Sequence, residues 1–218
     1  MCYPVRVIDT LMASFLGLMD RGGVVMWPLL ALSLLSATLL FERCWYYLRA
    51  NHPGRLAKAR RMAGHLRLRD YHAAKTLAQD ESGPYARYVR LLLEDETNMT
   101  SPLDTVETLR PNLERFMPTL STIITVAPML GILGTVLGII ASLQVLSDPG
   151  AAATDPRSVG QGIAEALITT AAGLVIAIFT LFPYNALRIQ VERTLTMLET
   201  LARAAAEGRS ADNREHSI

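Results

Sequence analysis

The stretch FMPTLSTIITVAPMLGILGTVLGIIASLQVLS, residues 116–147, contains no charged side chain. A continuous helix of this length would measure about 48 Å, whereas the hydrocarbon core of a bilayer is about 30 Å thick. The stretch therefore predicts a membrane-spanning helix that projects beyond the bilayer. We expect the projection at the Phe116 end, where Thr119, Ser121, Thr122 and Thr125 make the run less apolar.

Two more uncharged runs, residues 22–41 and 166–187, are each long enough to cross a membrane as a helix. A cleavable signal peptide is the alternative for the first run, but that run is too long, begins too late and is followed by no small-residue cleavage site. Between the second and third runs, the polar sequence DPGAAATDPRS contains the proline and glycine residues that end helices. We therefore expect the second and third spans to form a hairpin.

Basic residues decide the expected orientation, because basic loops are retained in the cytoplasm. Arginine and lysine residues are frequent directly after the first span, whereas the link between the second and third spans contains only Arg157. The predicted fold is an all-α integral membrane protein with three transmembrane helices, a periplasmic N terminus and a cytoplasmic C terminus. The second and third helices are expected to be long and to extend into the cytoplasm. The expected order is a periplasmic amphipathic segment (1–21), the first span (22–43), a cytoplasmic helical segment (44–115), the second span (116–147), a periplasmic link (148–157), the third span (158–187), and a cytoplasmic helix with a disordered tail from Gly208 (188–218).

Composition and motifs exclude several classes of function. Half of the residues are hydrophobic, and the net charge of +1 gives no sign of a nucleic-acid surface. The two cysteines and four histidines have no metal-site spacing, so we expect no metal and no cofactor. The segment 44–115 has no glycine-rich phosphate loop and no nucleophile motif, which favours a helical extension over an enzymatic domain. Breaks are expected near residues 83–84 and 101–102, with Ser101 or Thr100 as a cap.

Small residues gather on one face of the second span. On a helical wheel this face contains Gly131, Gly134, Thr135 and Gly138. In lipid, a stripe of small residues lets helix backbones approach closely, and threonine hydroxyls can form hydrogen bonds across the contact. Simple helix packing is one interpretation of this face, and a functional surface is the other.

Glu165 precedes the third uncharged run and falls in the predicted periplasmic half of the third span. An ionisable group at the bilayer centre costs about 2.5–3.5 kcal/mol, and less near the interface. The side chain is therefore expected to face water or a partner protein. Solvation by nearby headgroups is the alternative, because Glu165 is close in sequence to Ser158.

The stretches VAPMLGILGTVLGII (126–140) and GIAEALITTAAGLVIAI (162–178) closely resemble the paired helices of the MotA/TolQ/ExbB proton channels. The resemblance covers residues 116–201 and, more weakly, residues 22–43. It implies that the pore threonines are Thr135 and Thr170 and that the pore glutamate is Glu165.

The helical wheel leaves one point of this resemblance open. Thr169 lies about 40° from Glu165 around the helix, whereas Thr170 lies about 140° away. Either threonine could face the pore, and the motif favours Thr170. The family usually has a proline where this chain has Phe179, and here Pro183 stands four residues later.

The resemblance also implies partners and a mechanism. The family assembles as a homopentamer around a dimer of single-span ExbD/TolR-like subunits, whose transmembrane aspartate carries the proton. An ExbB-like subunit would energise TonB and outer-membrane transport, and a TolQ-like subunit would act with a TolA-like protein in envelope integrity and cell division. A MotA-like flagellar role ranks last, because no long cytoplasmic domain with charged rotor contacts is evident. A passive membrane scaffold, in which Glu165 only stabilises an assembly interface, is the alternative from another class.

Overall fold

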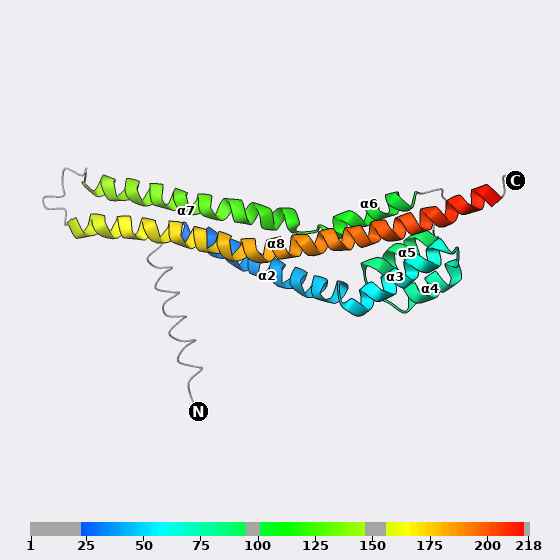
Figure 1. The fold of residues 1–218 in the computed structure, drawn as a ribbon. Coiled ribbons are helices and arrows are strands. Elements are labelled where there is room, and N and C mark those ends of the chain that lie inside the picture. Colours follow the sequence, from blue (N-terminus) through cyan, green and yellow to red (C-terminus); the bar gives the residue numbers. More distant parts are fainter. Residues whose placement is uncertain (1–22, 95–100, 147–155, 216–218) are drawn as a thin grey trace, which may run out of the picture. The chain divides into compact units, whose positions relative to one another are not determined.

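The computed structural model describes residues 23–94, 101–146 and 156–215, and every regular element within them is an α-helix. The predicted all-α class is confirmed. In chain order the helices are α2 (Met26–Ala50), α3 (Pro53–Arg67), α4 (Tyr71–Gln79), α5 (Pro84–Glu94), α6 (Pro102–Leu113), α7 (Met117–Leu146) and α8 (Pro156–Glu215) (Figure 1).

Among the described residues, three helices are long and apolar enough to cross a membrane. By length and composition, the candidate spans are Met26–Ala50, Met117–Gln144 and Val159–Ser210. The chain divides into two compact units. We call Met1–Leu40 with Thr119–Tyr184 the apolar unit, and Phe41–Pro118 with Asn185–Ile218 the polar unit.

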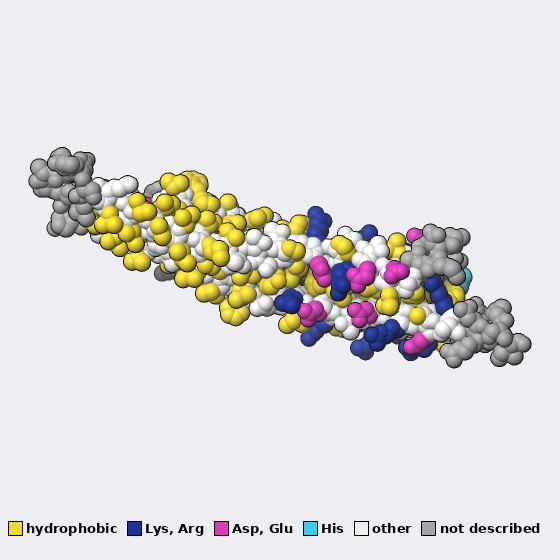
Figure 2. Space-filling model, turned by 90° about the horizontal axis from the view of Figure 1, so that it is seen from above, with side chains coloured by type: hydrophobic (Ala, Val, Ile, Leu, Met, Phe, Trp, Pro, Cys, Tyr) yellow, Lys and Arg dark blue, Asp and Glu magenta, His cyan; other side chains and the backbone are white. Residues whose placement is uncertain are grey.

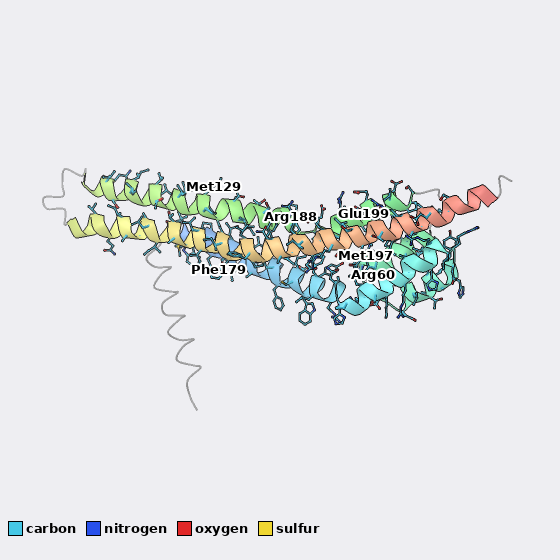
Figure 3. All side chains as sticks on the ribbon, in the orientation of Figure 1. Arg60, Met129, Phe179, Arg188, Met197 and Glu199 are labelled. Carbon is cyan, nitrogen blue, oxygen red and sulfur yellow. The ribbon has the colours of Figure 1, made fainter. Side chains whose placement is uncertain are left out.

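The apolar unit has a small core and an apolar exterior. Met26 and Leu29 of α2 pack with Ala127 of α7, and all three are buried. Large hydrophobic side chains face outwards: Met129 on α7 is 61% exposed and Phe179 on α8 is 75% exposed (Figure 3). Figure 2 shows hydrophobic side chains over this unit and charged side chains gathered on the polar unit. A large exposed apolar surface of this kind is typical of contact with lipid. Helices suit lipid as well, because they pair their backbone polar groups internally.

Prolines mark where helices of the polar unit begin. The helices α3, α5 and α6 begin at Pro53, Pro84 and Pro102. At the first position of a helix the N–H that proline lacks would have no partner within the helix, so proline is tolerated there. The breaks expected near residues 83–84 and 101–102 are therefore present. Ser101 is at the predicted N-cap position of α6, but its side chain forms no capping hydrogen bond.

Two other breaks were not predicted from the sequence. The chain leaves the helix between α2 and α3 at residues 51–52, and again between α3 and α4 at residues 68–70. Arg69 has a φ of +63°, and Asp70 then caps α4 by accepting a hydrogen bond from the N–H of Ala73 at 3.1 Å. In the described part of the segment after the first span, the helices α3 to α6 are all short.

Asn51, just after α2, joins three helices of the polar unit. Its Nδ2 donates to Oε1 of Gln190 on α8 at 2.9 Å. Its Oδ1 accepts from the hydroxyls of Tyr85 on α5 at 2.8 Å and Thr194 on α8 at 3.2 Å. Burial raises the pKa of Tyr85, which keeps that hydroxyl a donor. The network satisfies polar groups that would otherwise be unpaired inside the unit.

An ion-pair cluster links α3 to the segment between α4 and α5. The carboxylate of Glu81, between α4 and α5, lies 2.9 Å from Nε of Arg55 and 2.5 Å from Nζ of Lys58. The hydrogen bond from Lys58 and the neighbouring positive charges lower the pKa of Glu81. The negative form of Glu81 is therefore favoured in the folded unit.

Arg43 stabilises the corner between α6 and α7. Its side chain is buried, and its guanidinium carbon lies 5.0 Å from the ring centre of Phe116 and 5.7 Å from that of Tyr46. Phe116 has a φ of +68°, a conformation that is costly for a bulky residue. The cation–π contacts offset part of that cost.

The end of α8 differs from the expected disordered tail. The helix passes Pro183 without a break and continues to Glu215, so residues 208–215 are helical. Gly208 explains part of this, because a Cβ at that position would lie 2.5 Å from the carbonyl oxygen of Leu66 on α3. Arg67 and Glu207 add an ion pair at 2.6 Å beside the contact. The predicted segment 1–21, and the link up to residue 155, lie outside the described residues.

Candidate functional site: a threonine pair and a glutamate between two spans

Small residues form the contact between α7 and α8. The three glycines predicted for helix packing, Gly131, Gly134 and Gly138, all lie against α8 of the same chain. A Cβ on Gly131 would be 2.9 Å from Cα of Thr170, and one on Gly138 would be 2.7 Å from Cβ of Ala166. The partners run in opposite directions along the two helices, so α7 and α8 form an antiparallel hairpin, as expected (Figure 1).

The other side of this contact was not predicted. A Cβ on Gly173 of α8 would lie 2.5 Å from the carbonyl oxygen of Ala127 and 3.2 Å from Cα of Gly131. A Cβ on Gly162 would overlap the hydroxyl of Ser142. Because the small-residue stripe is used inside the hairpin, it gives no separate support for contact between copies of the chain.

Thr135 and Thr170 come together at the edge of the hairpin contact. The hydroxyl of Thr170 donates to the carbonyl oxygen of Gly131 at 2.8 Å and lies 3.3 Å from the hydroxyl of Thr135. Thr135 in turn donates to the carbonyl oxygen of Ile132 at 2.6 Å. Both threonines are half-buried. The two residues that the resemblance assigns to the pore are thus neighbours, although they are 35 positions apart in the sequence.

Thr169 has a different place from Thr170. It is 2% exposed, and its hydroxyl donates to the carbonyl oxygen of Ala166 at 2.7 Å. Its side chain fills the space beside Gly134, where a Cβ would overlap it. In this chain Thr169 is a packing residue of the hairpin, while Thr170 meets Thr135.

Glu165 is half-buried and lines a cavity of about 360 Å³ in the apolar unit. The cavity lies between α7, α8 and the start of α2, and small residues make up much of its wall. Ser142 and Thr169 add polar side chains to the lining, and Gly23 faces the carboxylate of Glu165. The carboxylate has room for water around it.

The chemistry of this site follows from its side chains. A threonine hydroxyl both donates and accepts a hydrogen bond and adds no fixed charge. The described residues contain no group of three or more His, Cys, Asp or Glu side chains that could hold a metal ion. The geometry therefore provides two neutral hydroxyls between the spans and one carboxylate beside a cavity.

Comparison with known proteins identifies the family. The model of the MotA/TolQ/ExbB proton channel family matches residues 86–200. The chain belongs to this family. MotA/TolQ/ExbB proteins are proton-channel and transport subunits rather than a class of enzymes, and family membership together with three apolar helices makes this chain a multi-pass inner-membrane protein.

Several curated members of the MotA/TolQ/ExbB family resemble the chain. An ExbB-like biopolymer transport protein of Synechocystis is 34% identical over 195 residues, covering 82% of this chain and 87% of the relative. A biopolymer transport protein ExbB of Vibrio cholerae is 27% identical over 86% of this chain and 85% of its own length. The Tol-Pal system protein TolQ of Haemophilus influenzae is 44% identical, but over 37% of this chain and 34% of the relative.

Sequence reasoning named the side chains of this candidate site but did not predict all the contacts around them. It named the threonine pair, Glu165 and the packing glycines of α7, whose roles in conduction stay predictions. It did not foresee Gly23 beside Glu165, or Gly173 against α7. The motif at residues 162–178 contains Gly173, but a glycine in an apolar run does not by itself indicate which helix it faces.

Proposed function

We propose that this protein is the proton-channel subunit of an inner-membrane motor that couples the proton-motive force to mechanical work, in the ExbB-like branch of its family. The supporting observation is the pair of hydroxyls of Thr135 and Thr170, 3.3 Å apart between two apolar spans. In the proposal, this pair holds a titrating carboxylate of a partner subunit, or a water beside it, while the carboxylate gains and loses a proton.

Glu165 has a separate role in the proposal. It supplies negative charge near the periplasmic end of the path, where it raises the local concentration of cations and orients water. A unit charge that crosses 100 mV releases about 2.3 kcal/mol, so a large conformational step needs several protons. The motor therefore has to couple repeated proton transfers to each mechanical step.

Partners and topology complete the proposal. The chain forms a homo-oligomer, expected as a pentamer, around a dimer of single-span ExbD/TolR-like subunits, and it drives a TonB-like protein. Its N terminus and the link 148–157 face the periplasm, and the polar unit faces the cytoplasm. The concentration of arginine and lysine after the first span supports this orientation.

The ExbB-like branch is supported by the long match to one ExbB-like relative, and the TolQ-like branch stays the alternative. The match to the ExbB-like protein of Synechocystis extends over most of both chains, whereas the more identical TolQ match is confined to about a third of each. Binding of purified chain to a TonB-like or a TolA-like protein would distinguish the branches. Preferential binding to the TolA-like protein would place the protein in the TolQ-like branch.

The central test is proton flux in liposomes that contain the protein with and without its single-span partner. Replacing Thr135 or Thr170 by valine keeps the side-chain shape and deletes the hydroxyl, so assembly should survive while flux falls. Thr125→Val is the matched control, because the hydroxyl of Thr125 also bonds within α7, donating to the carbonyl oxygen of Ser121 at 3.1 Å, while its side chain is exposed. Full flux in both test variants would contradict the threonine site.

The same experiment addresses a passive scaffold. A scaffold would show no flux with or without the partner, and Glu165→Gln would change only assembly. A motor subunit should instead keep its oligomeric state in Glu165→Gln, because the substitution removes a charge that is costly to bury. It should lose transport, because the carboxylate proposed for the proton path is gone.

A further inference from the structure

The start of the first membrane helix lies directly beside the carboxylate of Glu165. Gly23 precedes α2, and the carbonyl oxygen of Gly23 accepts the hydrogen bond from the N–H of Met26 at 3.1 Å that opens the first turn. A Cβ placed on Gly23 would lie 2.7 Å from Oε1 and 3.7 Å from Cδ of Glu165. Both residues line the same cavity.

Two independent features favour glycine at this position. Gly23 has a φ of +62°, which costs a residue with a side chain free energy on the order of 1 kcal/mol. In addition, a side chain would occupy the space in which the carboxylate of Glu165 now lies. The first turn of a helix also presents unpaired N–H groups and the positive end of the helix dipole, an environment that favours a nearby carboxylate.

We propose that Gly23 is a positioning residue for Glu165: its lack of a side chain leaves the space that the carboxylate occupies, so the start of α2 sets the direction of that side chain. This inference rests on the proposed function, in which Glu165 belongs to the proton path. It gives the first span a part in conduction, beyond holding the protein in the membrane.

The contact predicts a local effect of substitution. The atom that a new Cβ would meet is the far end of a flexible side chain, so the carboxylate can move away without disturbing the backbone of α8. The helices should therefore still pack, and Glu165 should point elsewhere in the cavity. Conduction should change while the fold does not.

The first test uses Gly23→Ala and Gly23→Asn in liposomes with the single-span partner. Both add a Cβ, but asparagine tolerates a positive φ better than alanine, so Asn separates displacement of Glu165 from backbone strain. We expect both variants to form the normal oligomer and to lose most of the proton flux. Gly160→Ala is the control, because nothing lies within 4 Å of a Cβ at that position, and it should keep full flux.

A rescue experiment separates positioning from a general structural role. Glu165→Asp shortens the side chain by one methylene and draws the carboxylate back, so alone it should reduce flux. Combined with Gly23→Ala, the shorter side chain makes room for the new Cβ, and flux should exceed that of Gly23→Ala alone. Loss of stability at Gly23 alone would not be repaired by a change at Glu165.

The outcomes distinguish the two levels of the proposal. Full flux in Glu165→Gln would overturn the proposed role of Glu165 in the proton path, and with it this inference. Reduced flux in Glu165→Gln together with full flux in both Gly23 variants would overturn only the positioning role. Absence of rescue in the double variant would do the same.

Discussion

Replacing Gly173 by alanine should push α7 and α8 apart at a point where their backbones lie close together. A Cβ there would lie 2.5 Å from the carbonyl oxygen of Ala127 and 3.2 Å from Cα of Gly131. Both contacts are to backbone atoms, which no change of rotamer can move. The two helices themselves therefore have to separate.

The size of the effect follows from these distances. A carbon and a carbonyl oxygen in ordinary contact are about 3.3 Å apart, so Gly173→Ala requires a separation of roughly 0.8 Å. A gap of about 0.5–1 Å forfeits a quarter to a half of the van der Waals attraction of the atoms involved. Overpacking costs about 1–3 kcal/mol, and alanine returns about 0.5–1 kcal/mol of helix propensity. The net destabilisation is then between about 0 and 2.5 kcal/mol.

The same separation should reach the threonine pair. The hydroxyls of Thr135 and Thr170 are 3.3 Å apart, and a widening of a few tenths of an ångström takes them beyond hydrogen-bond distance. Gly173→Ala should therefore lower proton flux as well as stability.

Two measurements check Gly173→Ala: unfolding by a denaturing detergent, followed by circular dichroism, and proton flux in liposomes. The control is again Gly160→Ala, which adds a Cβ in open space and should be neutral or more stable by up to about 1 kcal/mol. Equal stability and equal flux in the two variants would refute the close backbone contact between α7 and α8.

Three further predictions concern the polar unit and the topology. Asn51→Ala should destabilise the protein by about 1–3 kcal/mol in thermal unfolding, because it leaves the buried hydroxyl of Tyr85 without its acceptor. The pKa of Glu81 is lowered in the folded unit, so its contribution to stability is present above the unfolded pKa and is lost as the pH falls through the folded pKa. Glu81→Gln should therefore make the free energy of unfolding less dependent on pH below about pH 4.5. An unchanged pH dependence in that range would count against the ion-pair cluster. In a background without the other cysteine, exposed Cys44 should react with thiol reagents only from the cytoplasmic side, and a cysteine at Ala152 only from the periplasmic side; reversed labelling would contradict the proposed orientation.

The spans could be predicted from sequence because the signal is local. Each uncharged run reports directly on the free energy of placing its residues in lipid, whatever the rest of the chain does. Breaks were predicted where a proline follows a glycine or serine, as at residues 83–84 and 101–102. The break at residues 68–70 was missed because the sequence LRLRD contains neither glycine nor proline, and Arg69 adopts its positive φ through the surrounding structure.

The tail of α8 shows a tertiary effect that sequence composition hides. The sequence after Gly208 is polar, and polar segments are usually disordered when they have nothing to pack against. Here Gly208 lets α8 approach the carbonyl oxygen of Leu66 closely, and Arg67 pairs with Glu207 beside it. Contacts with α3 at Glu207 and Gly208 thus support the helix at the start of the segment that composition predicted to be disordered.

The question of Thr169 or Thr170 could not be settled on the wheel because the wheel used Glu165 as its reference. The direction that matters is the side of α8 that faces α7. Gly173 lies on that side, about 80° around the helix from Glu165. Thr169 and Thr170 then lie about 40° and 60° to either side of it, so both can contact α7. On one side Thr169 is enclosed against Gly134, and on the other Thr170 reaches Thr135. Glu165 lies farther from Gly173 around the helix, and its carboxylate faces Gly23 at the start of α2, in a cavity that Thr169 also lines.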